Sequence, residues 1–261
     1  MANAAIVINN LADVGTIGAS SAVVTMSTAN LLTPHVSERW RSQLGTAWFV
    51  LDLGSSQSVD TVMLRGMTLG ASSTARVRLS SSDSTGAAGD VSDSGSLTSG
   101  ASTYFDLDYG ALVYLLSAPA NCRYVRIDLT DPDAAYVEAG ALLAGLREQF
   151  DVNFSVGSGI TTIDRSRKAS SSGGQTLTWN DNQYRQIALT FDWINATQRY
   201  GVLERMLRVN GTHKNVLLIT DLASTNLARD SIFGLVSSQT PVAYLALPDL
   251  FSQQLTIDER L

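Results

Sequence analysis

The chain has 261 residues, enough for one large or two medium domains, and 44% of them are hydrophobic, enough for a buried core. Its 24 acidic residues outnumber its 18 basic ones and give a formal charge of −6. This balance speaks against a nucleic-acid partner, which needs clustered positive charge, and no apolar stretch approaches the ~18 residues of a membrane span.

The first 149 residues predict short β-strands that are separated by turns rich in serine, glycine and aspartate. Polar and apolar residues alternate in several runs, which is the two-residue period of a half-buried strand. The expected strands cover residues 48–54, 58–66, 75–80, 103–107 and 123–130. Residues 80–100 predict a long exposed loop. Short strands with turns between them favour an antiparallel β-sandwich over residues 1–149.

Residues 135–149 fit two alternatives. Their run of alanine and leucine is compatible with a helix or with a closing strand buried on both faces. We favour the strand, because Gly140 and Gly145 would each weaken a helix by ~1 kcal/mol.

A second domain is expected over residues 150–261. Phe150, Val152, Phe154 and Val156 alternate with polar residues and predict its first strand. The polar, Gly/Ser-rich stretch that follows predicts a long hairpin or loop. Further strands are expected at 176–179, 184–193, 215–220, 231–236, 242–247 and 253–257.

One amphipathic helix, at residues 196–209, is expected to pack on the sheet of this second domain. Asn195 suits the N-cap, and Asn210-Gly211 supplies the left-handed residue that ends a helix. Tyr200, Leu203 and Leu207 fall at helical spacing and form the predicted buried stripe. The stripe is widened by Val202, Met206 and Val209.

The residues that could carry chemistry are few. The two histidines, His35 and His213, lie in different predicted domains, and no nucleophile elbow, zinc spacing or phosphate-binding loop occurs. The single cysteine, Cys122, excludes an intrachain disulfide and is expected to be structural. We therefore predict no enzyme activity, no cofactor and no metal.

Three acidic residues follow the expected strand at 123–130. Asp131, Asp133 and Glu138 offer the oxygen ligands that calcium prefers, but no complete calcium-binding pattern surrounds them. A solvated turn is the favoured interpretation.

Several stretches of the first half occur in a recognisable order. They are Asn-Leu-Leu at 30–32, Arg-Trp-Arg-Ser at 39–42, Ala-Trp-Phe-Val-Leu-Asp-Leu-Gly at 47–54, Val-Asp-Thr-Val-Met-Leu at 59–64 and Arg-Tyr-Val-Arg-Ile at 123–127. Over about residues 20–147 the chain resembles the discoidin-like, galactose-binding jelly-roll family. The resemblance implies an eight-stranded sandwich whose loops at one end hold a sugar or another surface ligand.

Within that resemblance, His35, Arg39 and Trp40 are the loop residues expected to contact a ligand. Trp40 has two interpretations, because its indole could stack on a sugar ring or fill the core. Trp48 and Leu51 are expected in the core, and Asp52 and Arg126 are expected to be structural.

The second half is similar to the belt domain of long-tailed phage tail proteins of the distal-tail or minor-tail group. The likeness rests on Tyr-Arg-Gln-Ile-Ala-Leu-Thr-Phe-Asp-Trp at 184–193, Tyr-Gly-Val-Leu-Glu-Arg-Met-Leu at 200–207, Gly211 and Val-Leu-Leu-Ile-Thr-Asp at 216–221. It implies a strand, helix and strand arrangement that pairs sheet edges between copies in a ring.

The two resemblances together predict a structural protein of a phage tail tip. Its second domain would form or decorate a homo-oligomeric ring with tube and hub proteins, and its sandwich would face outward and bind a host-surface glycan. The expected location is the virion tail, after synthesis in the host cytoplasm. The alternative is a free carbohydrate-binding module or lectin without a virion role.

Overall fold

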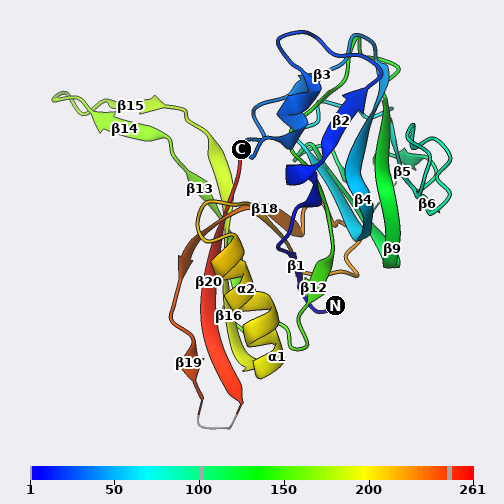
Figure 1. The fold of residues 1–261 in the computed structure, drawn as a ribbon. Helices are drawn as coiled ribbons and strands as arrows, with labels where there is room; N and C mark the ends of the chain where they lie inside the picture. Colours follow the sequence, from blue (N-terminus) through cyan, green and yellow to red (C-terminus); the bar gives the residue numbers. More distant parts are fainter. Residues whose placement is uncertain (1, 100–102, 246–248) are drawn as a thin grey trace. The chain divides into compact units, whose positions relative to one another are not determined.

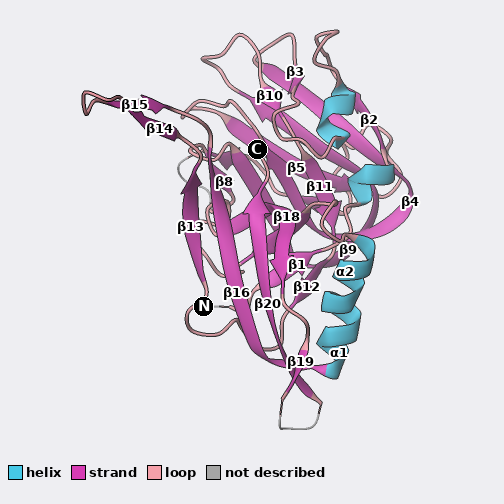
Figure 2. Ribbon diagram, turned by 90° about the vertical axis from the view of Figure 1, so that its left-hand side faces the viewer, coloured by secondary structure: helices cyan, strands magenta, loops and turns pink. Residues whose placement is uncertain are grey.

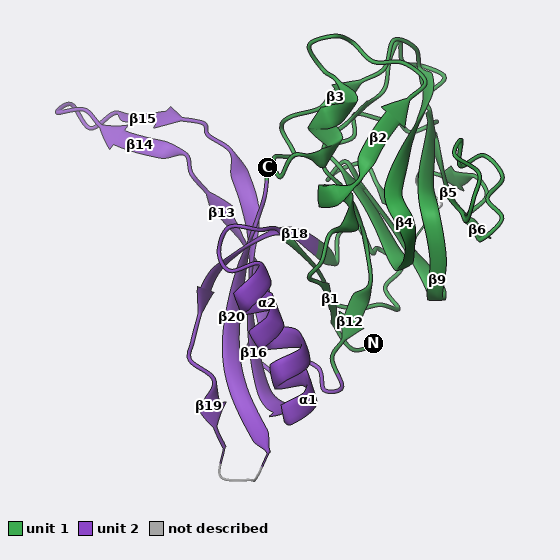
Figure 3. Ribbon diagram, viewed as in Figure 1, with its two compact units in different colours: residues 1–150, 216–231, 261 green, residues 151–215, 232–260 purple. Residues whose placement is uncertain are grey.

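The structure is a computed structural model that describes residues 2–99, 103–245 and 249–261. The fold is mainly β, as predicted (Figure 1). It divides into two compact units, coloured separately in Figure 3: unit 1 holds residues 1–150, 216–231 and 261, and unit 2 holds residues 151–215 and 232–260. The segment 216–231 thus belongs to unit 1, whereas the sequence analysis placed it in the second domain.

Unit 1 is a β-sandwich. Its strands are β1 (Ala5–Val7), β2 (Thr16–Ala19), β3 (Trp40–Arg41), β4 (Thr46–Arg65), β5 (Thr74–Ser80), β6 (Ser92–Asp93), β7 (Leu97–Thr98), β8 (Phe105–Asp106), β9 (Ala111–Thr130), β10 (Glu138–Ala139), β11 (Leu142–Gly145), β12 (Arg147–Gln149) and β17 (Val216–Ile219). Two short 3-10 helices, η1 (Leu11–Val14) and η2 (Thr28–Leu32), lie between the first strands.

Two long bent strands, β4 and β9, run through both layers of the sandwich. The first part of β4 pairs with the last part of β9, and the last part of β4 pairs with the first part of β9, with register shifts between Asp52 and Gln57 and between Val59 and Thr61. Sequence analysis predicted two separate strands here. The reason for the difference is Gly54, whose φ of +77° makes a bulge inside one continuous strand rather than a turn between two.

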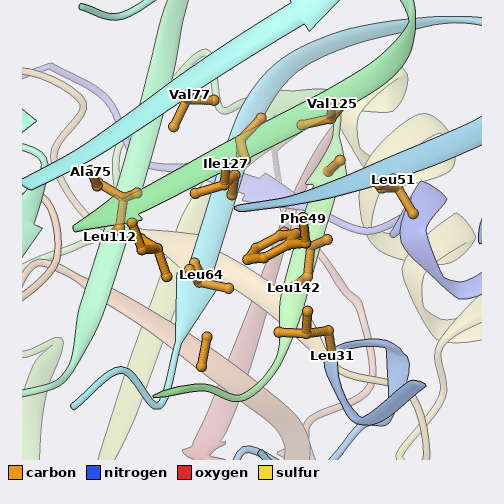
Figure 4. Packing of buried hydrophobic residues seen from close by; sticks show 14 of the residues in the cluster. Leu31, Phe49, Leu51, Leu64, Ala75, Val77, Leu112, Val125, Ile127 and Leu142 are labelled. Atoms are coloured by element: carbon orange, nitrogen blue, oxygen red, sulfur yellow. The ribbon is translucent and has the colours of Figure 1, made fainter. Parts of the chain in front are cut away.

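The layers are completed by neighbours on each side of these two strands. One layer has the order β2, first part of β4, last part of β9, β5, with β6 and β7 on β5. The other has the order β11, last part of β4, first part of β9, β8. Alternate side chains from both layers fill the space between them, as Figure 4 shows for Phe49, Leu64, Leu112, Ile127 and Leu142.

The alternative favoured for residues 135–149 is confirmed, because this stretch forms strands β10, β11 and β12. Residues 137–145 are buried throughout, as expected for a strand covered on both faces. Gly140 must be glycine for a packing reason, since an added Cβ would lie 2.3 Å from the Val36 carbonyl oxygen.

The strand predicted from Phe150 to Val156 is not formed. Phe150 is buried in unit 1, where its N–H donates to the Ala4 carbonyl at 2.9 Å. Val152 and Val156 are exposed, and residues 151–158 form turns and irregular backbone. The alternation was misleading because no neighbouring strand pairs with this stretch among the described residues. Its contact with β16 is a backbone hydrogen bond from the Ser155 N–H to the Thr190 carbonyl at 2.7 Å.

Unit 2 is a sheet with one helical segment. Its strands are β13 (Gly159–Asp164), β14 (Arg167–Ser170), β15 (Thr176–Trp179), β16 (Gln183–Asn195), β18 (Ser231–Gln239), β19 (Ala243–Tyr244) and β20 (Leu250–Glu259). Within the unit the order is β18, β20, β16, β13, with β19 on β20, and β14 and β15 form a separate ribbon. The helical segment lies along β16 and β20 in both views (Figures 1 and 2).

The helical segment consists of α1 (Ala196–Gln198), the π-helix η3 (Arg199–Glu204) and α2 (Arg205–Val209). Both predicted ends are confirmed. The Asn195 side chain accepts a hydrogen bond from the Gln198 N–H at 2.8 Å, and Gly211 adopts a φ of +52° just after the last turn. Among the described residues, no helix has the length and apolarity to cross a membrane.

The buried stripe of this helix differs from the predicted one. Leu203 is buried as expected, but Tyr200 is 57% exposed and Leu207 is only partly buried. Val202 and Met206 take their places in the core. The physical reason is η3: a π-helical turn holds more residues than an α-helical one, so it shifts the face that follows and breaks the regular three- and four-residue spacing.

Candidate functional site

The predicted loop residues do not converge on one exposed site. Trp40 is fully buried, its ring packs edge-on against Phe49 at 5.4 Å, and its Nε1–H donates to the Ser21 carbonyl at 3.0 Å. The core interpretation of Trp40 is therefore the one that the structure shows. His35 is exposed, and its carbonyl accepts a hydrogen bond from the Glu38 N–H.

Arg39 belongs to an ion-pair cluster around Glu138. The Glu138 carboxylate lies on β10, is 5% exposed, and accepts from Arg39 Nη1 at 3.3 Å and from Arg41 Nε at 2.5 Å. The Arg41 guanidinium also lies over the Tyr136 ring at 4.1 Å. This cluster ties β3 to β10 and accounts for Glu138.

The other two acidic residues of the predicted turn also have structural partners. Asp131 accepts from the Gly70 N–H at 2.6 Å and from the Asp133 N–H at 3.1 Å, and Asp133 accepts from the Ser72 hydroxyl. Within the described residues, no group of three potential metal ligands converges.

A groove lies instead on the outer face of the layer built from β2, β4, β9 and β5. The strand register decides which side chains reach this face. Residues paired across two strands point to the same face, and consecutive residues of one strand point to opposite faces. Leu51 and Ile127 point into the core (Figure 4), so Val50, Asp52 and Arg126 point outward. Thr16 pairs with Asp52, and Gly18 with Val50, which places β2 on the same face.

The groove has a volume of about 410 Å3, within the range of small-molecule sites. Its lining combines apolar surface with hydroxyl and carboxylate groups, contributed by Thr16, Ile17, Gly18, Ala19, Trp48, Val50, Asp52, Ser84, Thr85 and Tyr124. An added Cβ at Gly18 would have no neighbouring atom within 4 Å, so the groove is open over this residue.

Trp48 is the aromatic surface of the groove. Its side chain is partly exposed, and the Arg126 guanidinium lies over one face of its ring at 4.2 Å. Arg126 is itself held by Asp128, which accepts from Arg126 Nη2 at 2.8 Å and from Arg78 Nη2 at 2.7 Å. These contacts orient the indole. Arg126 and Arg78 share the one carboxylate of Asp128, so this cluster keeps a net positive charge beside the groove. Trp48 was expected in the core and lies on the opposite face of the strand.

Asp52 is the charged acceptor of the groove. Its carboxylate accepts from Arg123 Nε at 2.8 Å and Nη2 at 3.0 Å, and from the Gly54 N–H at 2.8 Å. The hydrogen bond from Arg123 is the main reason why the pKa of Asp52 lies below its usual value. Asp52 is therefore ionised at neutral pH, and its oxygens have lone pairs for further donors.

One wall of the groove is the loop between β5 and β6, which carries Ser84 and Thr85. Asp83 organises this loop: its carboxylate accepts from the Ala88 N–H at 2.8 Å and the Thr85 N–H at 2.9 Å. These hydrogen bonds lower the pKa of Asp83, and the bond from the Ala88 N–H has the largest effect. Arg126 Nη1 donates to the Thr85 carbonyl at 3.0 Å, which fastens the loop to the sheet.

Sequence reasoning missed this groove. The Asp-Ser-Thr-Gly stretch at 83–86 is a recognisable signal for an ordered turn, and it was included in a long exposed loop. Trp48 and Tyr124 lie 76 positions apart in the sequence, and only the pairing of β4 with β9 brings them to one face.

The groove offers binding groups rather than a catalytic set. The only cysteine, Cys122, is fully buried, and burial raises the pKa of its thiol to about 11. What the groove presents is an indole surface, a carboxylate and several hydroxyls. This combination can hold a small polar ligand that has an apolar face.

No protein-family model matches the chain, and no curated protein matches its sequence. Solved structures are similar to about half of it. Chitosan-binding module 2 of a chitosanase/glucanase from Paenibacillus sp. IK-5, in complex with chitotriose, shares 20% identity at a TM-score of 0.41, covering 52% of this chain and 100% of that one. The CBM32 of AlyQ, in complex with 4,5-unsaturated mannuronic acid, shares 20% at 0.39, covering 49% and 92%.

The lectin domain of Lectinolysin, complexed with Lewis B antigen, shares 15% identity at a TM-score of 0.39 and covers 52% of this chain and 95% of that one. These identities and TM-scores are low, so the ligands in those structures are properties of those modules. For the present chain, the groove on the outer face of unit 1 is the candidate site.

Proposed function

We propose that unit 1 binds a neutral glycan in the groove beside Trp48. The observation that carries this proposal is the combination of a partly exposed, oriented indole with hydroxyl and carboxylate acceptors in one groove. The C–H face of a pyranose ring is apolar and packs on an aromatic surface, while its hydroxyls need hydrogen-bond partners at the edge.

Each charged side chain at the groove already has a partner. Asp52 pairs with Arg123, and Asp128 accepts from both Arg126 and Arg78. Recognition of a neutral glycan would therefore rest on the indole and the hydroxyl groups, with the Asp52 oxygens as further acceptors. Thr85 and Tyr124 can donate to or accept from sugar hydroxyls.

A glycan array followed by titration calorimetry tests the proposal. We expect a neutral hexose oligosaccharide to bind, and Trp48→Ala to lower its affinity by at least about tenfold. Trp48→Phe should restore part of the affinity, because it keeps an aromatic surface. Tyr136→Ala is the matched control, since Tyr136 is an aromatic of the same unit, 40% exposed and outside the groove.

The same titration separates the groove from the loop residues predicted at the outset. If His35→Ala abolishes binding and Trp48→Ala does not, the glycan site lies on the loops and the groove proposal is wrong. Silence across the array, with the wild-type chain folded, would also overturn the proposal.

We also propose that unit 2 joins copies of this chain in a phage tail, as the resemblance of residues 184–193 and 200–207 implies. The supporting observation is an open sheet edge: in the described part of unit 2, β13 pairs with β16 on one side and with no strand on the other. Unpaired edges favour association between chains. Mass spectrometry of purified virions, with electron microscopy of the purified chain, would test this role; absence from virions would contradict it.

A further inference from the structure

The ribbon at residues 165–180, here called the arm, extends beyond the sheet of unit 2 (Figures 1 and 2). It contains β14, β15 and a turn in which the Ser171 N–H donates to the Gln175 carbonyl at 2.8 Å. Its residues are exposed throughout, except for the partly buried Ser166. A two-stranded hairpin is marginally stable in water unless its surface is covered. The arm therefore needs a covering partner to be well ordered.

The two faces of the arm differ in chemistry. Arg167 pairs with Trp179 and Ala169 pairs with Leu177, so these four side chains share one face. The opposite face carries Lys168, Ser170, Thr176 and Thr178. Leu177 is 50% exposed and Trp179 is 53% exposed, so apolar side chains of the first face are in contact with solvent. The second face is polar and is stable in water without a cover. The first face is the one that a partner would cover.

The charge of the arm indicates the partner. Residues 165–180 contain Arg165, Arg167 and Lys168 and no acidic residue. Without these three, the chain has 15 basic and 24 acidic residues, a formal charge of −9. A basic segment on an otherwise acidic chain is attracted to another copy of the same chain, and charge complementarity of this kind selects partners and orientation.

We infer that the arm docks on a second copy of this chain through the face of Arg167, Ala169, Leu177 and Trp179, with Arg167 beside an acidic group of that copy. Trp and Arg, the residue types that dominate binding energy at interfaces, lie side by side on this face. The inference goes beyond glycan binding by unit 1. It rests on the proposed assembly role of unit 2 and names the contact element and the partner.

Sedimentation velocity of the full-length chain over a range of concentrations tests this inference. We expect reversible association of the wild type and a dissociation constant at least about tenfold higher for the double variant Leu177→Ser, Trp179→Ser. The matched control is Thr176→Ala, Thr178→Ala, which alters the polar face of the same strand and should leave association unchanged. Because all four side chains are exposed, none of these changes is expected to unfold the chain.

Charge reversal tests the acidic partner surface. Arg167→Glu, on the docking face, should abolish association, whereas Arg208→Glu, with the same change in net charge outside the arm, should have a smaller effect. Raising the salt concentration from about 50 to about 500 mM should weaken wild-type association by screening.

The outcomes separate the inference from the assembly role on which it rests. If the wild type associates and the Leu177→Ser, Trp179→Ser variant associates equally well, the arm inference is wrong and assembly through another surface stands. If the wild type stays monomeric at every concentration, docking on a second copy is excluded. Detection of that monomeric chain in purified virions would then still support a tail role, and its absence there would remove both.

Discussion

Arg185 and Glu259 form a buried ion pair that joins β16 to β20 in unit 2. Arg185 Nη2 lies 2.5 Å from Glu259 Oε1, the Arg185 N–H donates to Oε2 at 3.0 Å, and each side chain is 6% exposed. A buried pair of this kind is costly to break, because removing one partner leaves the other charge buried without compensation.

We therefore predict that Glu259→Ala destabilises unit 2 by about 3–5 kcal/mol. The measurement is urea unfolding followed by circular dichroism. The matched control is Glu204→Ala, which breaks an exposed ion pair with Arg208. The Glu204 side chain is 38% exposed and the Arg208 side chain 78%, so this substitution should change stability by less than about 1 kcal/mol. Equal effects of the two substitutions would contradict the buried-pair argument.

The π-helical turn leads to a prediction about the helix face. Leu203→Asp places an unpaired charge in the core and should destabilise the fold by more than about 3 kcal/mol, whereas Tyr200→Asp changes a residue that is 57% exposed and should be tolerated. Thermal unfolding of both variants checks this, with Arg208→Ala as an exposed control on the same helix. If Tyr200→Asp unfolds the chain, Tyr200 is buried as the sequence predicts, and the helix face described here is wrong.

Asp93 makes the stability of unit 1 depend on pH. Its hydrogen bond from Arg76 lowers the pKa of the folded state to about 2, against an unfolded value of about 3.9. A lowered pKa contributes stability that is present above the unfolded pKa and is lost as the pH falls through the folded value. We expect Asp93→Asn to be less stable than the wild type above pH ~4 and to approach it only as the pH falls below ~2.

Urea titrations at several pH values measure that difference. Arg76→Gln should remove the same pH-dependent part, because it breaks the same pair from the other side. If the free energies of unfolding of the wild type and the variant differ by the same amount from neutral to acid pH, the ion pair is not the source of that difference.

Cys122 is expected to be inert until the sandwich opens. The thiol is fully buried, and its pKa of about 11 keeps it protonated at neutral pH. Iodoacetamide should leave the native chain unmodified and label it in parallel with unfolding in urea. Rapid labelling of the native chain would mean that β9 opens locally around this residue.

The sequence predicted the elements better than their junctions. Strand alternation, as in residues 123–130, and helix ends, as at Asn195 and Gly211, depend on neighbouring residues and are visible in a local pattern. The bulge at Gly54 and the π-helical turn at 199–204 depend on how many residues a partner element opposes. A single sequence does not contain that information.

The candidate site was missed for a related reason. Sequence reasoning nominated Trp40 together with His35 and Arg39 in a loop, although the Trp40 indole is buried and hydrogen bonded to the Ser21 carbonyl. Trp48 looked like core because it belongs to an apolar run, but the register of β4 puts it on the outer face. Which face a strand residue occupies becomes certain only when its neighbours in the sheet are known.

The path of the chain between the units limits how the protein can be dissected. Residues 216–231 return to unit 1, where β17 pairs with β1 in register from Ala5 and Ile219 to Val7 and Leu217. A protease cut or gene truncation near residue 150 would therefore separate β17 from its partner β1. The first piece would lack β17, and the second piece would contain β17 without β1. The sequence therefore cannot be divided at one point into the two compact units, and the candidate groove and the arm have to be studied in the full-length chain.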